Sequence, residues 1–521
     1  MQILSFSDID RRRLAWAVVL SCSVFISYAW FYNGIGMNHA SRLDMIFSAV
    51  HRGTLDITPF TRRDSPLFNT IDWARSPETP QVCYSNKAPG VALLGIPVYW
   101  LLVHIEDMAG VDITSVKWIN LNAYFINLVV TVLPMALATG VFFWTLCSRL
   151  SPVLAFGAAW SLAFCTLTFP FSTQLWGHTT AEALIIVGLC LAYRPSPPRL
   201  LGAGCCLGFA VLCEYSSIFV IFAWLLLHCH RRKLRHLGAF TAGGIVPGAI
   251  YLVYHGTLFH SILPATFFNN PILKAANQSI FHGGWTHLWT RLWGLTFSPY
   301  RGLFWYNPLF LLLLGMLFHW LVKGRRYRLT RMERVCLLSS GAFLAMNLAF
   351  HGWHGGWSSG PRYLIPALPC LIILIFFWFR RLRITTGHRR IAGFVGVGVL
   401  ALLSLSNMLI ISSVCTIAID LETPMDSVLE RRLWQNPLPY FYKSFFIDRL
   451  QPMTNRNFPV RLLPGKTGPR DERWRSFIMG RFLGCRGKWQ VLILLPVIFA
   501  PWIVLLYHRR GEIESATQKE Q

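Results

Sequence analysis

A lysine followed closely by a Pro-Gly pair stands at the head of an apolar run in this sequence. Lys87 lies in the stretch Tyr84-Ser85-Asn86-Lys87-Ala88-Pro89-Gly90, which closes a long polar segment. A cation at a membrane boundary is costly unless an anion neutralises it, and a Pro-Gly pair fixes a turn that lets backbone approach a ligand. The pattern indicates an anion-binding loop in which Tyr84 and Asn86 flank Lys87. A lysine that reaches towards lipid headgroups is the alternative.

Two stretches place a possible base near the end of an apolar run. In the first, His39, Arg42 and Asp44 lie within one or two turns of each other if the stretch is helical, so a base and a cation could face the membrane surface. In the second, His178 and Glu182 are four residues apart and share one helix face. That carboxylate falls at the start of an apolar span and needs a partner. The alternatives are a solvated helix start for the first stretch and a structural polar pair for the second.

Two further stretches combine aromatic residues, glycine and arginine. Trp353, His354 and Trp357 surround a pair of glycines ahead of Arg362. Glycine lets backbone approach a ligand closely, tryptophan stacks on the flat face of a sugar, and arginine can bind phosphate oxygens through two hydrogen bonds. Arg301, in the other stretch, is a second candidate for an anion contact. The alternatives are an aromatic belt with an arginine that reaches to the interface, and a helix start at the interface.

Composition places the chain among multi-spanning membrane proteins. Of its 521 residues, 54% are hydrophobic and only 14% are charged. The formal net charge is +25, but the basic residues lie in short clusters between apolar runs, as the positive-inside rule describes, and not in the single patch of a nucleic-acid-binding protein. Four histidines have spacings that fit no recognised metal-ligand pattern, so neither a metal nor another cofactor is expected: His39, His178, His351 and His354.

Hydropathy and charge predict an all-α bundle of about twelve transmembrane helices with both termini in the cytoplasm. The run Val91–Ile105 is expected to lie flat at the outer interface, because a crossing there would put nearly all basic clusters outside. The long apolar run Leu200–His228 is predicted to break at its middle, where Glu214 begins a polar stretch. The expected units are a transmembrane module over residues 1–414 with its first outer loop at 33–117, an external polar segment or small domain over 415–488, and a last helix with a cytoplasmic tail over 489–521.

Together these motifs resemble those of the polyprenyl-phosphate-sugar-dependent glycosyltransferases of the GT-C superfamily. The protein O-mannosyltransferases and the lipid A aminoarabinose transferases look like the nearest branch. In that family a first helix precedes an outer loop with an acidic residue near an arginine, and a lysine-proline motif and a flat juxtamembrane helix follow. Residues 38–44 are similar to the first part loosely, and Asn86–Gly90 with the helix after it is similar to the second. The resemblance covers most of residues 14–383 and implies a GT-C-like bundle with juxtamembrane helices on the outer face.

The resemblance implies an inverting transfer of a sugar at the outer face. A carboxylate deprotonates an acceptor hydroxyl, which attacks the sugar carbon that carries the phosphate, while Lys87 and Arg362 stabilise the departing lipid phosphate. Relatives carry an aspartate a few residues ahead of the loop arginine, where this chain has no carboxylate. Asp44 is therefore the first candidate for the base, His39 the second and Glu182 the third.

The sequence is thus expected to encode a multi-pass glycosyltransferase of a bacterial inner membrane, with its site facing the periplasm or exterior. Its partners would be a polyprenyl-phosphate-linked sugar donor, a glycan, lipid or protein acceptor and membrane lipid, but no nucleic acid. Two other classes stay open. A transporter or flippase for a lipid-linked sugar should show inverted repeats, and a non-catalytic membrane assembly factor would keep the fold and lose the base. The expected contacts to donor phosphate and substrate are Lys87, Arg362, Arg301, Tyr84, Asn86, Arg42, His178, Trp353, His354 and Trp357.

Overall fold

The computed structural model describes residues 8–228, 234–268, 271, 287–324, 328–350, 352–356, 358–382, 387–414, 445, 474 and 476–520. Most of these residues are helical, because a backbone in lipid must satisfy its hydrogen bonds within the segment. The first elements along the chain are α1 (Asp8–Ala29), β1 (Phe31–Tyr32), α2 (Met37–Arg52), α3 (Thr58–Thr61), β2 (Trp73–Arg75), β3 (Cys83–Ser85), α4 (Gly90–Met108), α5 (Val116–Asn127), η1 (Leu128–Val132), α6 (Leu133–Leu146), α7 (Pro152–Phe164), α8 (Thr168–Ser172), α9 (Gly177–Tyr193), α10 (Pro197–Cys213), η2 (Tyr215–Ser217) and α11 (Ile218–His228). They are followed by α12 (Leu234–Gly243), α13 (Ile245–Phe259), η4 (Ala265–Phe268), α15 (Leu288–Thr296), α16 (Leu303–Tyr306), η6 (Pro308–Leu311), α17 (Leu312–Lys323), α18 (Arg331–Ala349), η8 (Arg362–Ala367), α19 (Leu368–Arg381), α20 (Gly387–Val414), β4 (Phe477–Ile478), η11 (Met479–Arg481), α23 (Trp489–Leu492) and α24 (Leu495–Glu520).

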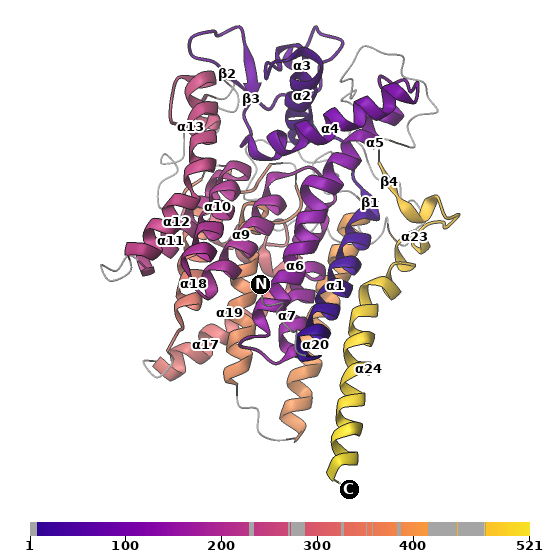
Figure 1. Cartoon of the computed structure of the whole chain (residues 1–521), viewed down its shortest axis with the longest axis vertical. Helices are drawn as coiled ribbons and strands as arrows, with labels where there is room; N and C mark the ends of the chain where they lie inside the picture. Colours follow the sequence, from indigo (N-terminus) through magenta and orange to yellow (C-terminus); the bar gives the residue numbers. More distant parts are fainter. Residues whose placement is uncertain are drawn as a thin grey trace, which may run out of the picture.

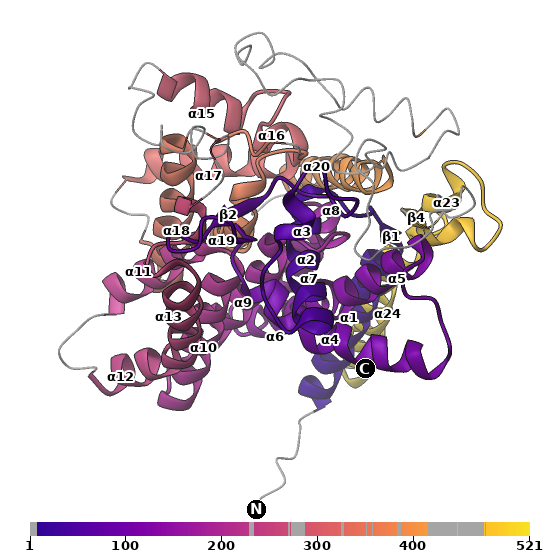
Figure 2. The same cartoon turned by 90° about the horizontal axis from the view of Figure 1, so that it is seen from above.

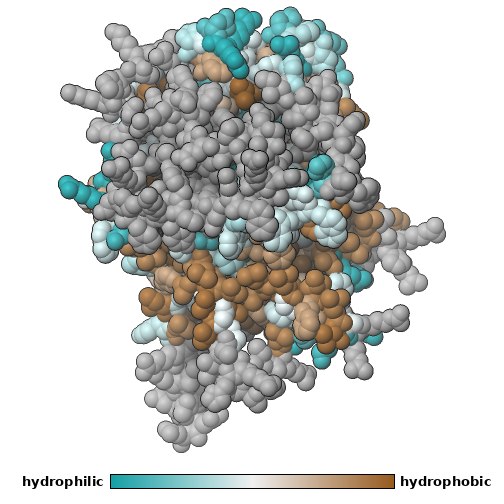
Figure 3. Space-filling view, turned by 180° about the vertical axis from the view of Figure 1, so that it is seen from behind, coloured by the Kyte–Doolittle hydropathy of each residue, from teal (hydrophilic) through white to brown (hydrophobic). Residues whose placement is uncertain are grey.

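The chain is a multi-pass membrane protein, with several apolar helices in one bundle (Figure 1). Within the described residues six helical stretches are long and apolar enough to cross a membrane, and the bent pair α12–α13 would make a seventh. Most of the other predicted crossings fall on shorter apolar helices, so the expected number of about twelve spans is not confirmed by helix length. Figure 3 shows a band of apolar side chains on the face seen from behind, as expected where lipid is the neighbour.

Helices α1, α6, α7 and α9 form the centre of the bundle, with α24 packed on α1 and α19 on α7. A Cβ at Gly140 of α6 would come within 2.4 Å of the Ser21 Oγ of α1, so the two helices approach as closely as a small residue allows. The Tyr28 hydroxyl donates to the Ala163 carbonyl at 2.7 Å, and Trp160 Nε1 donates to the Ile498 carbonyl at 3.0 Å. These contacts fix the bundle that carries the candidate site at its end.

One end of the bundle carries a layer made of α2, α3, the β2–β3 hairpin and α4 (Figures 1 and 2). By length and composition α4 is one of the six candidate spans. In both views, however, it lies across the end of the bundle instead of alongside α6 and α24, which is the orientation expected of a helix at an interface. The predicted break in the long apolar run is also present, since α10 ends at Cys213 and a 3-10 turn separates it from α11.

The two-residue strand β1, which directly follows the first helix, pairs with β4 from the far end of the chain. The pairing is antiparallel, with Phe31 opposite Ile478 and Tyr32 opposite Phe477. Trp30 adds a hydrogen bond from its ring nitrogen to the Gln490 carbonyl at 2.7 Å. Of the predicted external segment 415–488, only 445, 474 and 476–488 are described, so its expected form as a small domain lies outside the described residues.

Candidate functional site

A short hairpin places Lys87 against a carboxylate that the sequence analysis did not single out. Trp73 of β2 lies opposite Ser85 of β3, so Asp72 and Lys87 both leave the hairpin at its open end. Lys87 Nζ lies 3.0 Å from Asp72 Oδ1, and both side chains are largely buried, with 17% and 16% of their surface exposed. The lysine is therefore neutralised by a protein anion in this structure and does not extend into lipid.

Helix α2 holds this hairpin and contributes a second cation. Ser41 Oγ lies 2.5 Å from the carbonyl of Asp72 and 2.8 Å from Ser85 Oγ, which fixes the hairpin on the helix. The next residue, Arg42, donates from Nη1 to the Asn38 carbonyl at 3.0 Å. Its Nε is buried and has no hydrogen-bond partner among the described residues, so this guanidinium retains a donor that an incoming acceptor could use.

Two glycines allow three chain segments to meet beside the backbone of Cys213. A Cβ on Gly177, at the start of α9, would lie 2.2 Å from the Cys213 carbonyl oxygen and 3.2 Å from Arg42 Nη2. A Cβ on Gly90, at the start of α4, would lie 2.7 Å from the carbonyl carbon of Leu212. Only glycine permits such approaches. They bring the starts of α4 and α9 to the end of α10, and with them the charged residues next to each glycine.

The residues that follow Gly177 and Cys213 form an ionisable pair. His178 Nδ1 lies 2.8 Å from Glu214 Oε2, and the histidine is 5% exposed. His178 was predicted to share a helix face with Glu182, but its contact runs to the break between α10 and α11 instead. The ring of Tyr363 meets the His178 ring at 5.8 Å, which brings the start of η8 to the same place.

Arg362 begins η8 and adds the third cation. Its guanidinium lies over the Trp176 ring, 4.8 Å from the centroid, and its Nη2 donates to the Tyr363 hydroxyl at 3.1 Å. Gly355 has a φ of 77°, and its α-carbon lies against this side chain, since a Cβ there would be 3.0 Å from Arg362 Cγ. The glycines around Arg362 therefore let backbone approach the arginine closely.

We call Arg42, Asp72, Lys87, Glu214 and Arg362 the charged cluster. Burial lowers the pKa of Lys87; Asp72 opposes this effect, while Arg42 and Arg362 add to it. Burial likewise lowers the pKa of Arg42 to about 10, so this arginine stays charged at neutral pH. With His178 neutral, three cations and two carboxylates leave one positive charge in a region that excludes most water. Such a cluster favours the binding of an anion.

The three predicted bases make their hydrogen bonds outside the charged cluster, although Arg42 lies near enough to His39 to lower its pKa. Asp44 is fully buried, and its Oδ1 accepts from Asn69 Nδ2 at 2.8 Å, while burial raises its pKa well above the ordinary value. His39 contacts the Gly34 carbonyl through Nδ1 at 3.0 Å, and burial lowers its pKa to about 3. Glu182 accepts from the Thr168 hydroxyl at 2.8 Å deep in α9. None of the three is an ion-pair partner of a cluster residue among the described residues.

The structure assigns structural contacts to the other arginine and to the aromatic loop. Arg301 is fully buried and donates from Nε to the His354 carbonyl at 3.1 Å and from Nη2 to the Gly356 carbonyl at 2.9 Å. Trp353 packs with Leu295 in a small buried group, and a Cβ on Gly294 would clash with its ring at 2.2 Å. Both therefore contact or pack beside the loop ahead of Arg362. Trp357 lies outside the described residues.

The two remaining predicted contacts flank Lys87 and differ in exposure. Tyr84 packs edge-on against Phe259 of α13, with ring centroids 5.8 Å apart. Asn86 is 2% exposed, and its Oδ1 has no hydrogen-bond partner among the described residues. Sequence reasoning missed Asp72 and Glu214. The polar break ahead of α11 was a signal for the second, whereas the first depends on a hairpin register that the sequence does not display.

No group of three His, Cys, Asp or Glu side chains within the described part of the chain could hold a metal ion. The charged cluster consists instead of nitrogen cations and their counter-ions, which suit a phosphate or carboxylate ligand. Lys87 offers a compact charge, while Arg42 and Arg362 offer planar donors.

Comparisons with known proteins give matches among solved structures alone. No protein-family model and no curated protein matches the chain. The structure is similar to that of ArnT from Cupriavidus metallidurans bound to undecaprenyl phosphate, with a TM-score of 0.43 and 14% identity over 75% of this chain. The apo structure of the same protein matches with a TM-score of 0.45 and 13% identity over 96% of this chain and 73% of that one. The match to the bound form spans 64% of that chain, less than two thirds of its length.

Proposed function

We propose that the chain is a membrane glycosyltransferase that moves a sugar from a polyprenyl-phosphate-linked donor to an acceptor hydroxyl at the end of the bundle that carries α2 and α4. The observation that carries this proposal is the convergence of Lys87, Arg42 and Arg362 from three distant parts of the chain. A membrane protein keeps buried cations together only where an anion offsets their repulsion. A lipid phosphate places such an anion at the boundary of the bilayer.

The cations would act on the leaving group. As the acceptor oxygen attacks the sugar carbon, the bond from that carbon to the phosphate oxygen breaks, and its electron pair stays on the phosphate. The departing lipid phosphate gains negative charge in this step. Fixed cations therefore stabilise the transition state more than the ground state. Lys87, Arg42 and Arg362 would share that charge, with Arg301 left to hold the loop.

We assign the base to a carboxylate of the charged cluster. Asp72 is the first candidate because it touches Lys87 at 3.0 Å, and an incoming phosphate that binds the lysine would release it. The freed carboxylate could then accept the proton of the acceptor hydroxyl. Glu214, paired with His178 at 2.8 Å, is the second candidate. Asp44, His39 and Glu182 are held in contacts outside the cluster, so they follow these two in our proposal.

A binding measurement on the purified full chain tests the phosphate site. Undecaprenyl phosphate is added to the protein in detergent, and its dissociation constant is measured for wild type, Lys87→Ala and Arg362→Ala. We expect each substitution to weaken binding by roughly 10- to 100-fold, since a hydrogen bond to a charged group contributes about 1.5–3 kcal/mol. Arg75→Ala is the matched control, because Arg75 lies on the same hairpin but is exposed. Equal affinity in all four proteins would reject the site.

A kinetic measurement separates the base from a simple counter-ion. Asp72→Asn removes the negative charge beside Lys87 and keeps the shape of the side chain. If Asp72 is the base, turnover should fall by about 10²–10⁴-fold, while affinity for undecaprenyl phosphate should rise or stay the same. Unchanged turnover would exclude this role and leave Glu214→Gln as the next variant. Donor binding without sugar transfer to any acceptor would favour the assembly-factor alternative.

A further inference from the structure

A pocket, which we call the hollow, lies at the other end of α9, away from the charged cluster. The hollow has a volume of about 270 Å³, and its lining includes Arg149, Arg331 and Arg380 beside Tyr193, Trp224 and Phe377. Helix α9 starts at the charged cluster and ends at Tyr193, roughly 24 Å further on at 1.5 Å per residue. The two regions therefore lie at opposite ends of the bundle and cannot hold the same headgroup.

The charge of this hollow is one-sided. Among the residues that the structure describes, its lining includes three arginines and no aspartate or glutamate. The nearby acid Glu333 is 1% exposed and is paired with Arg381, which also donates to the Arg328 carbonyl at 3.1 Å. Because that carboxylate already has its own arginine, it does not neutralise Arg331 or Arg380. All three lining arginines are exposed to the surroundings, so an external anion can reach them.

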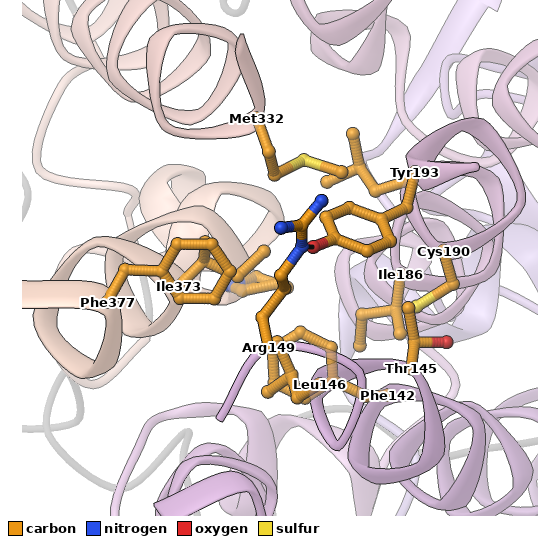
Figure 4. A pocket seen from close by; sticks show the side chains of 12 residues that line it. Phe142, Thr145, Leu146, Arg149, Ile186, Cys190, Tyr193, Met332, Ile373 and Phe377 are labelled. Atoms are coloured by element: carbon orange, nitrogen blue, oxygen red, sulfur yellow. Dashed lines mark hydrogen bonds between the residues drawn. The ribbon is translucent and has the colours of Figure 1, made fainter. Parts of the chain in front are cut away.

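An apolar slot continues from the hollow into the bundle (Figure 4). Slot and hollow share four lining residues: Arg149, Tyr193, Met332 and Phe377. Beyond them the slot is lined by apolar side chains of α6, α9 and α19, among them Phe142, Ile186 and Ile373. Its free volume is only about 20 Å³, so no more than the first carbons of a chain could enter it.

Arg149 stands where the basic hollow and the apolar slot meet. In Figure 4 its guanidinium lies between Tyr193 and Met332, above Leu146 and Phe142. Its Nε donates to the Tyr193 hydroxyl at 2.5 Å, and its carbonyl accepts from Arg380 Nη1 at 3.2 Å. These contacts hold the guanidinium groups of Arg149 and Arg380 at the opening of the slot. A molecule that binds here must therefore carry an anionic group next to an apolar chain.

We propose that this region is a binding site for an anionic glycerophospholipid, with the headgroup phosphate on Arg149, Arg331 and Arg380 and the first part of one acyl chain along the slot. Basic pockets between membrane helices bind anionic lipid headgroups in this way. The site is independent of the charged cluster and of the proposed transfer reaction. It would fix the ends of α6, α9, α18 and α19 relative to one another through a bound lipid.

Native mass spectrometry of the full chain tests the proposal with phosphatidylglycerol and phosphatidylcholine of identical acyl chains. We expect phosphatidylglycerol to bind more tightly to the wild type. Arg331→Gln and Arg380→Gln should each weaken it by about fivefold, the effect of one basic residue near a membrane surface. Arg334→Gln is the matched control, because Arg334 lies on the same helix, is exposed and does not line the hollow. Equal binding of both lipids, or an equal loss in the control, would overturn the site.

A second experiment distinguishes the binding of a lipid from the binding of a soluble phosphate. Glycerol 3-phosphate carries the headgroup chemistry without an acyl chain, and we expect it to compete poorly for the site. Cys190→Phe or Ile186→Phe fills the slot and should weaken phosphatidylglycerol several-fold. Two slot variants are used so that one with an unchanged melting midpoint can be chosen. Full competition by glycerol 3-phosphate, or unchanged lipid binding in a folded slot variant, would overturn the lipid assignment.

Discussion

At the scale of single residues, the charged cluster makes a strong prediction about Lys87 and Arg362. Arg362 lies near enough to Lys87 to lower the pKa of the lysine, so the two cations lie close together. If they share one phosphate, the double variant Lys87→Ala/Arg362→Ala should lose less activity than the product of the two single losses, because residues in one network are not additive. A double-mutant cycle on sugar transfer measures this coupling. Fully multiplicative losses would mean that the two cations act on separate groups.

His39 predicts how stability depends on pH. Burial holds its folded pKa at about 3, far below the ordinary value of 6.5. The unfolded chain therefore binds more protons than the folded one between these values, and stability is lost as the pH falls through this window. His39→Asn should reduce that slope by up to about 1.4 kcal/mol per pH unit. The melting midpoint in detergent across the window measures it.

His104 provides the control for this prediction, because it is an exposed histidine on a neighbouring helix. Asp44 contributes a pH dependence of stability with the opposite sign. Its folded pKa is raised by burial, so its contribution to stability is full below the ordinary pKa of an aspartate and is lost as the pH rises from there through the folded pKa. An acid slope that persists unchanged in His39→Asn would show that His39 is not the group responsible.

At the scale of elements, Gly177 decides whether the site can form. An alanine there would place Cβ 2.2 Å from the Cys213 carbonyl oxygen, so α9 or the end of α10 must move. We expect Gly177→Ala to lower stability by about 1–3 kcal/mol and to weaken undecaprenyl phosphate binding through the displacement of His178 and Arg42. Melting midpoints and binding constants of the purified variants measure both effects.

Gly248 on α13 is the matched control, since a Cβ there would meet no atom within 4 Å. Gly248→Ala should be neutral or slightly stabilising, because alanine favours helix over glycine by about 1 kcal/mol. If the two alanine variants behaved alike, close packing at Cys213 would not be what assembles the site.

The sequence predicted some of these elements and not others, for physical reasons. A polar Glu214 in a long apolar run is costly in lipid, and a break at this position was predicted and confirmed. The apolar run Val91–Ile105 was predicted to be a helix, and α4 begins at Gly90. The partner of Lys87 could not be predicted, because the register of two three-residue strands carries no strong pattern.

At the scale of the whole molecule, the distribution of charge predicts orientation. Arg334 in α18 is next to Val335, which lines the basic hollow, and Arg63 follows α3, which lies at the other end of the bundle in Figure 1. By the positive-inside rule we expect the first to be cytoplasmic and the second external. A membrane-impermeant maleimide should label Arg63→Cys in intact cells and Arg334→Cys only after permeabilisation. Wild type supplies the background of native cysteines, and the reverse pattern would invert the topology.

The overall architecture was easier to predict than its details. Apolar runs identified the membrane class, because lipid exposure demands long apolar helices. The number of spans was harder, since helices such as α7 and α9 are shorter than an upright crossing requires. The cations of the charged cluster were predicted as phosphate or substrate contacts from residue type and position near span ends, and this role stays a prediction. Their counter-ions come from contacts between segments far apart in the chain, which one sequence does not reveal.

The pairing of β1 with β4 has a consequence for how the molecule is made. Phe31 emerges from the ribosome about 450 residues before Ile478, so at roughly 5–20 residues per second it waits some 20 to 90 seconds for its partner. During that time the ring nitrogen of Trp30 and the backbone of β1 lack the contacts that α23 and β4 later supply. The last helix packs beside the first. A chain truncated before β4 would therefore leave β1, the first strand to be synthesised, without its partner.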